Sequence, residues 1–273
     1  MELDLHIHSN ASDGSLDPCD IVARAARGGL DVIALADHDT VGGVEEAIRA
    51  GVDNRVHVIP AVELSVGADV TDIHILGYYV NPGNEALLAH ANEAARRREE
   101  RLRIMLKRLT KQGIELSFEE VQGVRAAAPG TGTIGRLHLA QALVEAGYVE
   151  YTAEAFVRYI GNDHDAYVPL RLLTPVEAVR LIGGAGGIAV WAHPPRRYLR
   201  ELIGELVGCG LRGLEIYRPR TPPDQIIELE RVAQGWGLLV TGGSDWHGPQ
   251  HGELGEFSVP ASDVAAFLDA GGI

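Results

Sequence analysis

Short apolar runs alternate with amphipathic stretches along the first 80 residues of the chain. The runs at residues 3–8, 32–36, 56–62 and 73–79 have the length and the aliphatic or β-branched character of strands. Between the first two, the amphipathic segment 19–27 stops at a pair of glycines, as a helix often does. Strands that alternate with helices are typical of βα units around a parallel sheet.

Residues 85–170 interrupt this alternation. They contain few strand-like runs, and their longest helical segment extends from Glu85 to Gln112 and stops at Gly113. Residues 86–170 hold 11 basic and 11 acidic side chains, so the net charge of −14 lies outside them. We interpret 85–170 as a helical insert, or cap, that forms a separate domain.

Alternation resumes after the insert. Strands are expected at residues 187–191, 213–217 and 238–241, separated by helices that begin near Thr174, Arg200 and Pro223. With the four earlier runs this makes seven strands, enough for most or all of a barrel. The sequence therefore predicts an α/β barrel built from residues 1–84 and 171–273. The glycine-rich segment 183–187 is expected to be a tight turn from helix to strand.

Composition narrows the class of protein. With 273 residues, 46% of them hydrophobic, the chain has the makeup of a soluble globular protein, and no apolar run reaches the ~18 residues of a membrane span. The N-terminus has no features of a secretory signal, so a cytoplasmic protein without membrane partners is expected. Cys19 and Cys209 are too few for a disulfide framework and are expected to be free thiols.

The net charge of −14 argues against binding to long nucleic acid, which requires many basic contacts to phosphate. It does not exclude a small phosphorylated substrate, because bound divalent cations create a local positive field. The oligomeric state is not indicated by the sequence.

The first expected strand ends in two histidines, His6 and His8. Polar and apolar residues alternate here, so the two imidazoles should share one face while Leu5 and Ile7 pack on the other. Imidazole is a common metal ligand, but two core or edge histidines explain this motif equally well.

Further ligand-type side chains follow or lie within the other expected strands: Asp13, His38, Glu63, His74, His193, Asp245 and His247. Each alone has an ordinary explanation, such as a turn for Asp13, a solvated charge for Glu63 or a satisfied strand histidine for His74. Active sites of α/β barrels lie at the C-terminal ends of the strands, so the recurrence predicts one common metal centre.

The donor set indicates which metals would bind. Imidazole and carboxylate ligands without cysteine fit manganese, iron or zinc in an open hydrolytic site. Nine ligands exceed the needs of one ion, so two or three divalent ions are expected, with Glu63 and Asp245 as bridges. Such clusters convert a bridging water to hydroxide and clamp the oxygens of a phosphoryl group.

Four motifs, DLHIHS, ALADHDT, WAHP and GGSDWHG, resemble those of the polymerase and histidinol phosphatase (PHP) family of metal-dependent phosphoesterases. With Asp13, Glu63 and His74 they match the nine metal-binding positions of that family, over essentially the whole chain. The resemblance implies a distorted seven-stranded (β/α)7 barrel with three metal ions, manganese first, with iron or zinc as alternatives.

The resemblance also implies which residues bind each of the three ions. It assigns His6, His8, Glu63 and Asp245 to a first ion and its bridges, Asp13, His38 and His247 to a second ion, and His74 and His193 to a third. Asp13 stands where histidinol phosphatases carry histidine, which favours a nucleotide-directed branch.

Two segments of the insert, GRLHLA and DAYVP, resemble a capped subgroup of the family. That subgroup includes phosphatases of nucleoside 3′,5′-bisphosphates and 5′-to-3′ exonucleases of short RNA. The similarity implies that Arg136 and His138 contact substrate phosphate; otherwise they are a surface arginine and a packed histidine. Relatives often carry basic residues just before the second segment, whereas residues 161–165 are acidic here, which leaves the substrate open.

Other arginines allow two interpretations, a contact with the substrate or a solvated surface position. The run PPRRY resembles the family pattern HPGRY and makes Arg197 a second candidate for phosphate, against a solvated loop residue. The arginines at 96–103 are interspersed with glutamates, so a salt-bridged helix surface is the better interpretation, although one or two could turn into the cleft.

The sequence thus predicts a phosphoesterase that removes a terminal phosphate from nucleotides or degrades short RNA from its 5′ end. A metal-bridging hydroxide attacks phosphorus, and Asp245 is the expected proton acceptor. The alternatives are a histidinol-phosphate phosphatase and a non-catalytic PHP module.

Overall fold

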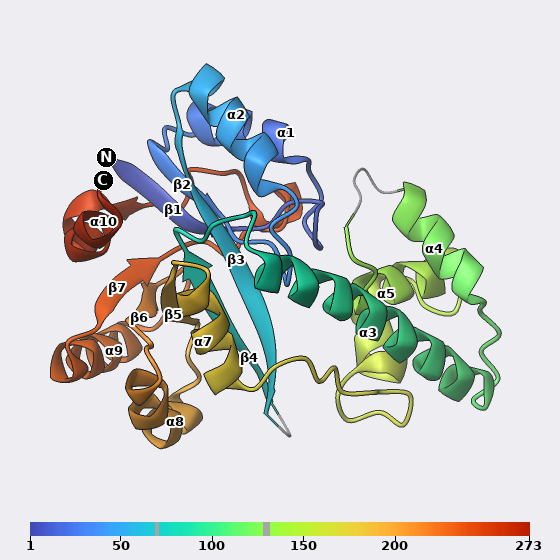
Figure 1. Cartoon of the computed structure of the whole chain (residues 1–273). Helices are drawn as coiled ribbons and strands as arrows, with labels where there is room; N and C mark the ends of the chain where they lie inside the picture. Colours follow the sequence, from blue (N-terminus) through green and yellow to red (C-terminus); the bar gives the residue numbers. More distant parts are fainter. Residues whose placement is uncertain (69–70, 128–131) are drawn as a thin grey trace.

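The computed structural model describes residues 1–68, 71–127 and 132–273, and its centre is one eight-stranded sheet (Figure 1). The strand order is β7-β6-β5-β4-β3-β2-β1-β8. The strands are β1 (Glu2–Ile7), β2 (Val32–Leu35), β3 (His57–Ala68), β4 (Thr71–Tyr78), β5 (Ile188–Ala192), β6 (Gly213–Tyr217), β7 (Leu239–Gly242) and β8 (Val259–Pro260). Beyond β7, Trp246 pairs with Ile7 of β1, so the sheet curls into a nearly closed barrel.

The direction of β4 corrects the expectation of a parallel sheet. β4 runs antiparallel to both β3 and β5, whereas β1–β2–β3 and β5–β6–β7 are parallel. The reason is the connection: β3 ends at Ala68 and β4 begins at Thr71, too close for the crossover helix that parallel strands need. All seven expected strands are present. The eighth, β8, pairs antiparallel with β1 and is too short to leave a periodic signal in the sequence.

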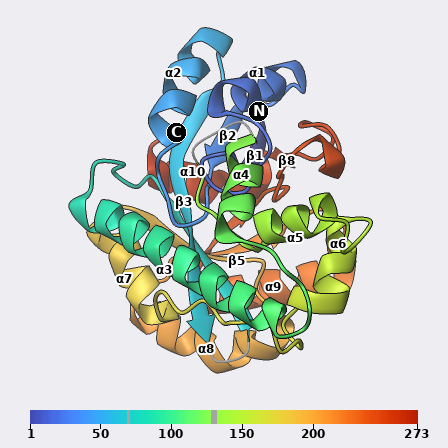
Figure 2. The ribbon, with the colours of Figure 1, turned by 90° about the vertical axis from the view of Figure 1, so that its right-hand side faces the viewer.

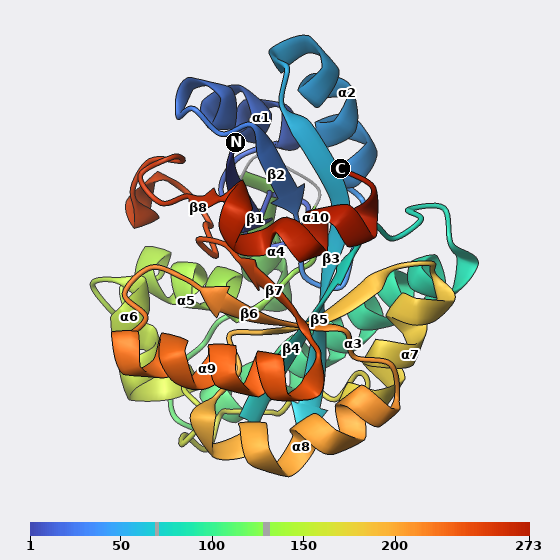
Figure 3. The same cartoon turned by 90° about the vertical axis from the view of Figure 1, so that its left-hand side faces the viewer.

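Helices cover the outside of the barrel (Figures 1 and 3). They are α1 (Pro18–Arg27), α2 (Val44–Asn54), α7 (Pro175–Gly184), α8 (Arg196–Gly208) and α9 (Pro223–Trp236). A last helix, α10 (Ala265–Gly271), lies at the end of the barrel opposite the insert, where Phe267 packs edge-on to Tyr78 with ring centroids 4.9 Å apart. Helix α10 covers this end of the barrel, which leaves the opposite end, next to the insert, for a functional site.

Local sequence explains where α7 begins and ends. Thr174 and Glu177 form a reciprocal capping box, and Pro175 occupies the first turn, where its missing N–H costs nothing. The chain then turns into β5 through Gly186, whose φ of +80° suits glycine, and through Gly187, where a side chain would collide with Val80. The predicted tight turn from helix to strand is confirmed.

The insert contains α3 (Glu85–Thr110), α4 (Phe118–Ala127), α5 (Arg136–Glu145), α6 (Thr152–Ala155) and the π-helical turn η1 (Phe156–Ile160). Figure 2 views the molecule from this side. The insert has its own apolar core, which includes Leu106, Phe118 and Leu139. Helix α3 contributes to two cores, because Leu87 near its start packs in the barrel and Leu102 in the insert. The domain boundaries at 84/85 and 170/171 stay predictions.

Within the described residues, no helix is both long and apolar enough to cross a bilayer. Cys19 and Cys209 are free thiols, as predicted.

Candidate metal centre

The nine side chains that the sequence singled out lie together at the open end of the barrel. They come from the strands and the loops that follow them: His6, His8 and Asp13 from β1 and its loop, His38 after β2, Glu63 within β3, His74 within β4, His193 after β5, and Asp245 and His247 after β7. His74 stands early in its strand, and the reversed direction of β4 brings that half of the strand to the same end.

His6 and His8 converge as predicted, with ring centroids 5.0 Å apart. The expected shared packing of Leu5 and Ile7 is wrong. Leu5 packs in the cluster that contains α10, and Ile7 packs in the cluster with α1. The reason is an irregularity in the pairing of β1 with β2 between Asp4 and Ile7, which breaks the strict alternation of faces.

Glu63 is the hub of the group, and its side chain is only 1% exposed. Its Oε2 lies within 3.3 Å of imidazole nitrogens of His6, His8 and His38. Its Oε1 lies 2.9 Å from His74 Nδ1 and 3.1 Å from His193 Nε2. The two oxygens of one carboxylate therefore face different histidines, which is the arrangement that a bridging ligand needs.

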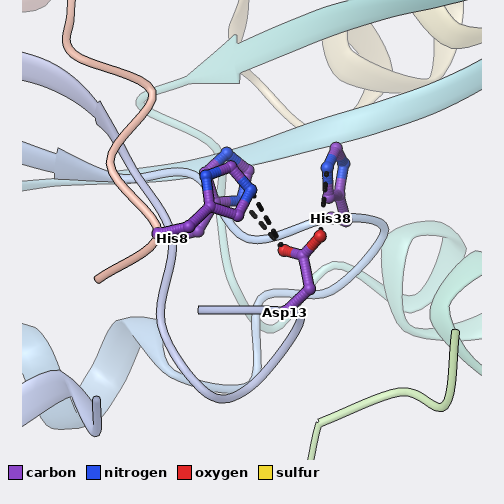
Figure 4. A group of neighbouring side chains, drawn as sticks. His8, Asp13 and His38 are labelled. Carbon is purple, nitrogen blue, oxygen red and sulfur yellow. Dashed lines mark ion pairs between the residues drawn. The ribbon is translucent and has the colours of Figure 1, made fainter. Parts of the chain in front are cut away.

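Two aspartates complete the group. Asp245 Oδ1 lies 3.2 Å from His8 Nε2 and 3.5 Å from His6 Nε2. Asp13 lies 3.7 Å from His8 Nδ1, 3.8 Å from His38 Nε2 and 3.4 Å from His247 Nε2. Figure 4 shows the carboxylate of Asp13 between His8 and His38.

Three sets of these atoms are compact enough to hold an ion, with the ligand atoms of each set within 4.8 Å of one another. The sets are His6, His8, Glu63 and Asp245; His8, Asp13, His38 and His247; and His38, Glu63 and His74. His193 adjoins the third set, since its Nε2 lies 3.2 Å from His74 Nδ1.

Several of these buried atoms have close neighbours but no hydrogen bond. They are His6 Nε2, both ring nitrogens of His8, His38 Nδ1 and Glu63 Oε2. Buried polar atoms are normally satisfied, so orphans concentrated at one point require an explanation. These atoms belong to the three compact sets described above, as the atoms of metal ligands do. The residues present therefore fit a divalent-metal centre.

Electrostatics supports this interpretation. Burial opposes protonation of His6, yet the nearby carboxylates, above all Glu63, hold its pKa well above its usual value. Burial also opposes protonation of His8, but Asp245 and Glu63 raise its pKa to about 10. Burial would raise the pKa of Glu63, but the imidazoles around it, first His74, hold it well below its usual value. The site thus concentrates carboxylate charge that attracts cations.

Two buried aspartates outside the nine predicted ligands hold the ligand loops. Asp37 accepts hydrogen bonds from the Ser9 N–H at 2.7 Å and from the hydroxyls of Ser9 and Ser12 at 2.6 Å, which fixes the loop to Asp13. Asp4 accepts from the N–H and hydroxyl of Ser244, next to Asp245. In both cases the signal was present as an aspartate beside a predicted ligand or within its strand.

Glu215 is a further residue that sequence reasoning missed. It is fully buried in β6 and accepts hydrogen bonds from His6 Nδ1–H and from the backbone N–H of His193, both at 2.8 Å. A charged residue inside the apolar run 213–217 was the available signal, because a buried carboxylate needs partners.

The backbone is strained at two of the candidate ligands. His193 has φ of +32° and Asp245 has φ of +58°, both in the left-handed region that side chains other than glycine rarely adopt. Such conformations persist where the surrounding structure holds them, and they cluster at functional sites.

Two clefts open beside the centre, and Leu137 of α5 lines both. The smaller, of about 220 Å³, lies between Asp13, His38 and His74 of the barrel and Arg98, Arg101, Arg136 and His138 of the insert. The larger, of about 1020 Å³, is lined by Asp245, Trp246 and His247 together with Arg218 and Arg220. The insert and the barrel therefore share the walls of the site.

The predicted substrate contacts have different positions. Arg136 lines the small cleft, donates to Asn162 Oδ1 at 2.8 Å and lies over the rings of Phe156 and Tyr167. His138 lines the same cleft, and its Nδ1 accepts the Gly135 N–H at 3.0 Å.

Arg197 is exposed on α8, over the ring of Tyr198, and is not among the residues that line either cleft. Its predicted contact with phosphate stays a prediction.

The arginines of α3 include some in surface ion pairs and two at the cleft, as the sequence suggested. Arg96 and Arg97 pair with Glu93 on the helix surface. Arg98 and Arg101 instead line the small cleft.

The sequence matches known proteins along almost its whole length. The family model of the PHP domain matches residues 4–127. A 5′-3′ exoribonuclease of Haemophilus influenzae is 36% identical over 90% of this chain and 90% of its own. A 3′,5′-nucleoside bisphosphate phosphatase of Chromobacterium violaceum is 33% identical over 92% of this chain and 88% of its own.

The fold matches as well. A crystal structure assigned to a metal-dependent phosphoesterase of Bifidobacterium adolescentis superimposes with a TM-score of 0.86 at 32% identity, and the match covers 98% of this chain and 95% of that one. The chain therefore belongs to the PHP family, and it is a phosphoesterase, a hydrolase that acts on phosphoric ester bonds.

Proposed function

We propose that the protein removes the terminal phosphate of small nucleotides, such as nucleoside 3′,5′-bisphosphates, or degrades short RNA from its 5′ end. The observation that carries this proposal is the small cleft, where Arg101 and Arg136 of the insert face the histidine and carboxylate cluster of the barrel, beside Arg98, which is paired with Asp39. Guanidinium groups bind phosphate through paired N–H donors. The two relatives above are named for these two activities.

The nine candidate ligands would hold two or three divalent ions, with manganese as the first choice and iron or zinc as alternatives. The grouping around Glu63 supports a shared centre, with Glu63 and Asp245 as bridges. When bound, such ions supply an acidified water as nucleophile and neutralise the charge on the phosphoryl oxygens.

Residues of the chain would orient the phosphate. Arg136 is held between Phe156 and Tyr167, so its guanidinium is preorganised at the cleft and loses little freedom on binding. In His138, Nδ1 accepts the Gly135 N–H, so the neutral ring carries its proton on Nε2. That N–H is then available as a donor to an anionic oxygen in the cleft.

Asp245 is our candidate for proton acceptor. Its side chain is 30% exposed, while that of Glu63 is 1% exposed, although both lie next to His6 and His8. Asp245 also lines the large cleft. Of the two central carboxylates, Asp245 is therefore the one that water and substrate can reach.

The size and charge of the clefts favour a short substrate. The large cleft has room for a nucleoside beside the cluster. Next to the small cleft, Asn162 contacts Arg136 within the acidic segment 161–165, which contains Asp163 and Asp165. This acidic segment, together with a net charge of −14, disfavours a long polyanion.

A substrate panel tests the proposal. The protein, purified with Mn²⁺, is assayed against 3′,5′-bisphosphonucleosides, 5′-phosphorylated oligoribonucleotides and histidinol phosphate. We expect turnover of one or both nucleotide substrates, with kcat/KM at least tenfold above that for histidinol phosphate. Preference for histidinol phosphate would establish the alternative phosphatase activity instead, and no turnover of either nucleotide class would refute the proposal.

A further inference from the structure

Glu215 is buried beside the candidate metal centre without belonging to the nine candidate ligands. Its neighbours in β6, Leu214 and Ile216, pack in the apolar core. Its two carboxylate oxygens are used separately: Oε1 accepts from His6 Nδ1 and Oε2 from the backbone N–H of His193, each at 2.8 Å. A carboxylate in such a position is costly unless both oxygens are satisfied.

The bond to His6 fixes the state of its ring. A carboxylate can only accept, so His6 donates from Nδ1, and in the neutral ring that binds a metal the lone pair lies on Nε2, next to Glu63 and Asp245. That nitrogen lies 3.2 Å from Glu63 Oε2 and 3.5 Å from Asp245 Oδ1 and has no hydrogen bond. Partners of this kind set the tautomer and the orientation of metal-binding histidines.

The bond to His193 acts on the backbone. His193 adopts φ of +32°, a strained conformation, directly after β5. The accepted N–H holds this turn and so places the ring, whose Nε2 lies 3.1 Å from Glu63 Oε1 and 3.2 Å from His74 Nδ1. Glu215 therefore sets the position of one histidine through its ring and of the other through its main chain.

We propose that Glu215 is a positioning residue that couples two parts of the metal centre, the part around His6 and the part around His193. The two histidines approach opposite oxygens of Glu63, so they would hold different ions, and the carboxylate of Glu215 orients both. The part formed by Asp13, His38 and His247 has no contact with Glu215 among the described interactions. The proposal rests on the proposed metal centre and not on the identity of the substrate.

The test is metal binding by the substrate-free protein. Glu215→Gln keeps the shape of the side chain but replaces one acceptor oxygen with an NH₂ group, so the two bonds cannot both persist. Mn²⁺ is titrated calorimetrically into metal-free protein. In Glu215→Gln we expect the Kd for Mn²⁺ to rise 10- to 100-fold at the parts around His6 and His193. The Kd at the part formed by Asp13, His38 and His247 should stay within twofold of wild type. The variant His247→Ala shows which step of the titration belongs to this last part.

The matched control is Glu230→Gln. Glu230 accepts a hydrogen bond from the Tyr217 hydroxyl at 2.9 Å, on the exposed side of the neighbouring helix α9, so this variant should bind Mn²⁺ as wild type does. Equal weakening of all binding steps, weakening of the His6 step alone, or unchanged binding in Glu215→Gln would each overturn the coupling.

A second variant keeps the test possible if Glu215→Gln does not fold. Glu215→Asp keeps the charge but is one methylene shorter and cannot span both donors, so it should show the same selective loss of Mn²⁺ binding. If neither variant folds, the role of Glu215 is structural and the proposal is overturned. The Mn²⁺ titration contains no nucleotide, so a protein that shows the selective loss but hydrolyses no nucleotide would refute only the proposed function.

Discussion

A terminal nitrogen of Arg98 lies 2.5 Å from a carboxylate oxygen of Asp39, which joins helix α3 of the insert to the loop that carries His38. Asp39 is 1% exposed and also accepts from His90 Nε2 at 3.0 Å and from the Ser65 N–H at 2.9 Å. Burial would raise the pKa of this carboxyl, but Arg98 and His90 hold it well below its usual range. Asp39 is therefore a buried anion that depends on the insert.

Arg98→Met should destabilise the protein by about 3–5 kcal/mol, because it removes the cation and leaves Asp39 buried and partly unpaired. The free energy of unfolding is measured with urea. Arg96→Met is the control, since Arg96 is 55% exposed in surface pairs and should change stability by about 0.5 kcal/mol or less. The double variant Arg98→Met, Asp39→Asn should recover part of the loss. Equal effects of the two arginine variants would contradict the role of the buried pair.

Asp245→Asn should lower kcat by about 100-fold or more, because an amide is a poor metal ligand and a poor proton acceptor. In the metal-free protein the melting temperature should stay close to that of metal-free wild type, since the change is isosteric and removes no core packing. Steady-state kinetics with Mn²⁺ and circular dichroism measure the two quantities. Asp224→Asn, on the exposed surface of α9, is the control. Turnover within twofold of wild type would remove Asp245 from the mechanism.

Arg136→Ala should raise KM and lower kcat/KM by about 10- to 100-fold, the effect of losing a charge-assisted hydrogen bond of about 1.5–3 kcal/mol. Arg158→Ala is the control, because Arg158 also belongs to the insert but pairs with Glu154 on the surface. Kinetics on the substrate identified by the panel provide the measurement. If both variants behave like wild type, Arg136 is a structural residue of the cap.

Removal of divalent metal should lower the melting temperature, because the clustered carboxylates lose their counter-charge. At a free concentration 100 times its Kd, one bound ion stabilises the fold by about 2.7 kcal/mol. Melting is followed after chelation and again after addition of Mn²⁺. In Glu63→Gln the response to Mn²⁺ should be strongly reduced, because Glu63 contacts five histidines of the group. A melting temperature independent of Mn²⁺ in the wild type would argue against the metal centre.

The sequence predicted the barrel and its family because both depend on local and repeated signals. Each apolar run became a strand, and the ligand-type residues after those runs meet because strand ends meet. The enzyme class is confirmed by the relatives. The assignment of individual ligands to ions stays a prediction, as do manganese and the cytoplasmic location.

Other features could not be predicted because they depend on contacts between distant segments. The antiparallel direction of β4 follows from the connection to β3, and the run 73–79 alone carries no direction. Arg98 and Arg96 are equivalent in sequence, and only the packing of α3 separates them. Likewise the role of Glu215 became visible only when β6 was placed beside His6 and His193.

Because α3 packs in both the barrel core and the insert core, the point at which caps can be exchanged between such enzymes is restricted. The start of the helix belongs to the barrel core through Leu87, and its middle reaches Asp39 through Arg98 before the insert core begins at Leu102. A chimaera that exchanges the cap at residue 85 would cut away part of the barrel along with it. If the new cap is instead joined to the host between Arg98 and Leu102, the chimaera gains a new substrate pocket. The host then keeps its own ion pair between Arg98 and Asp39.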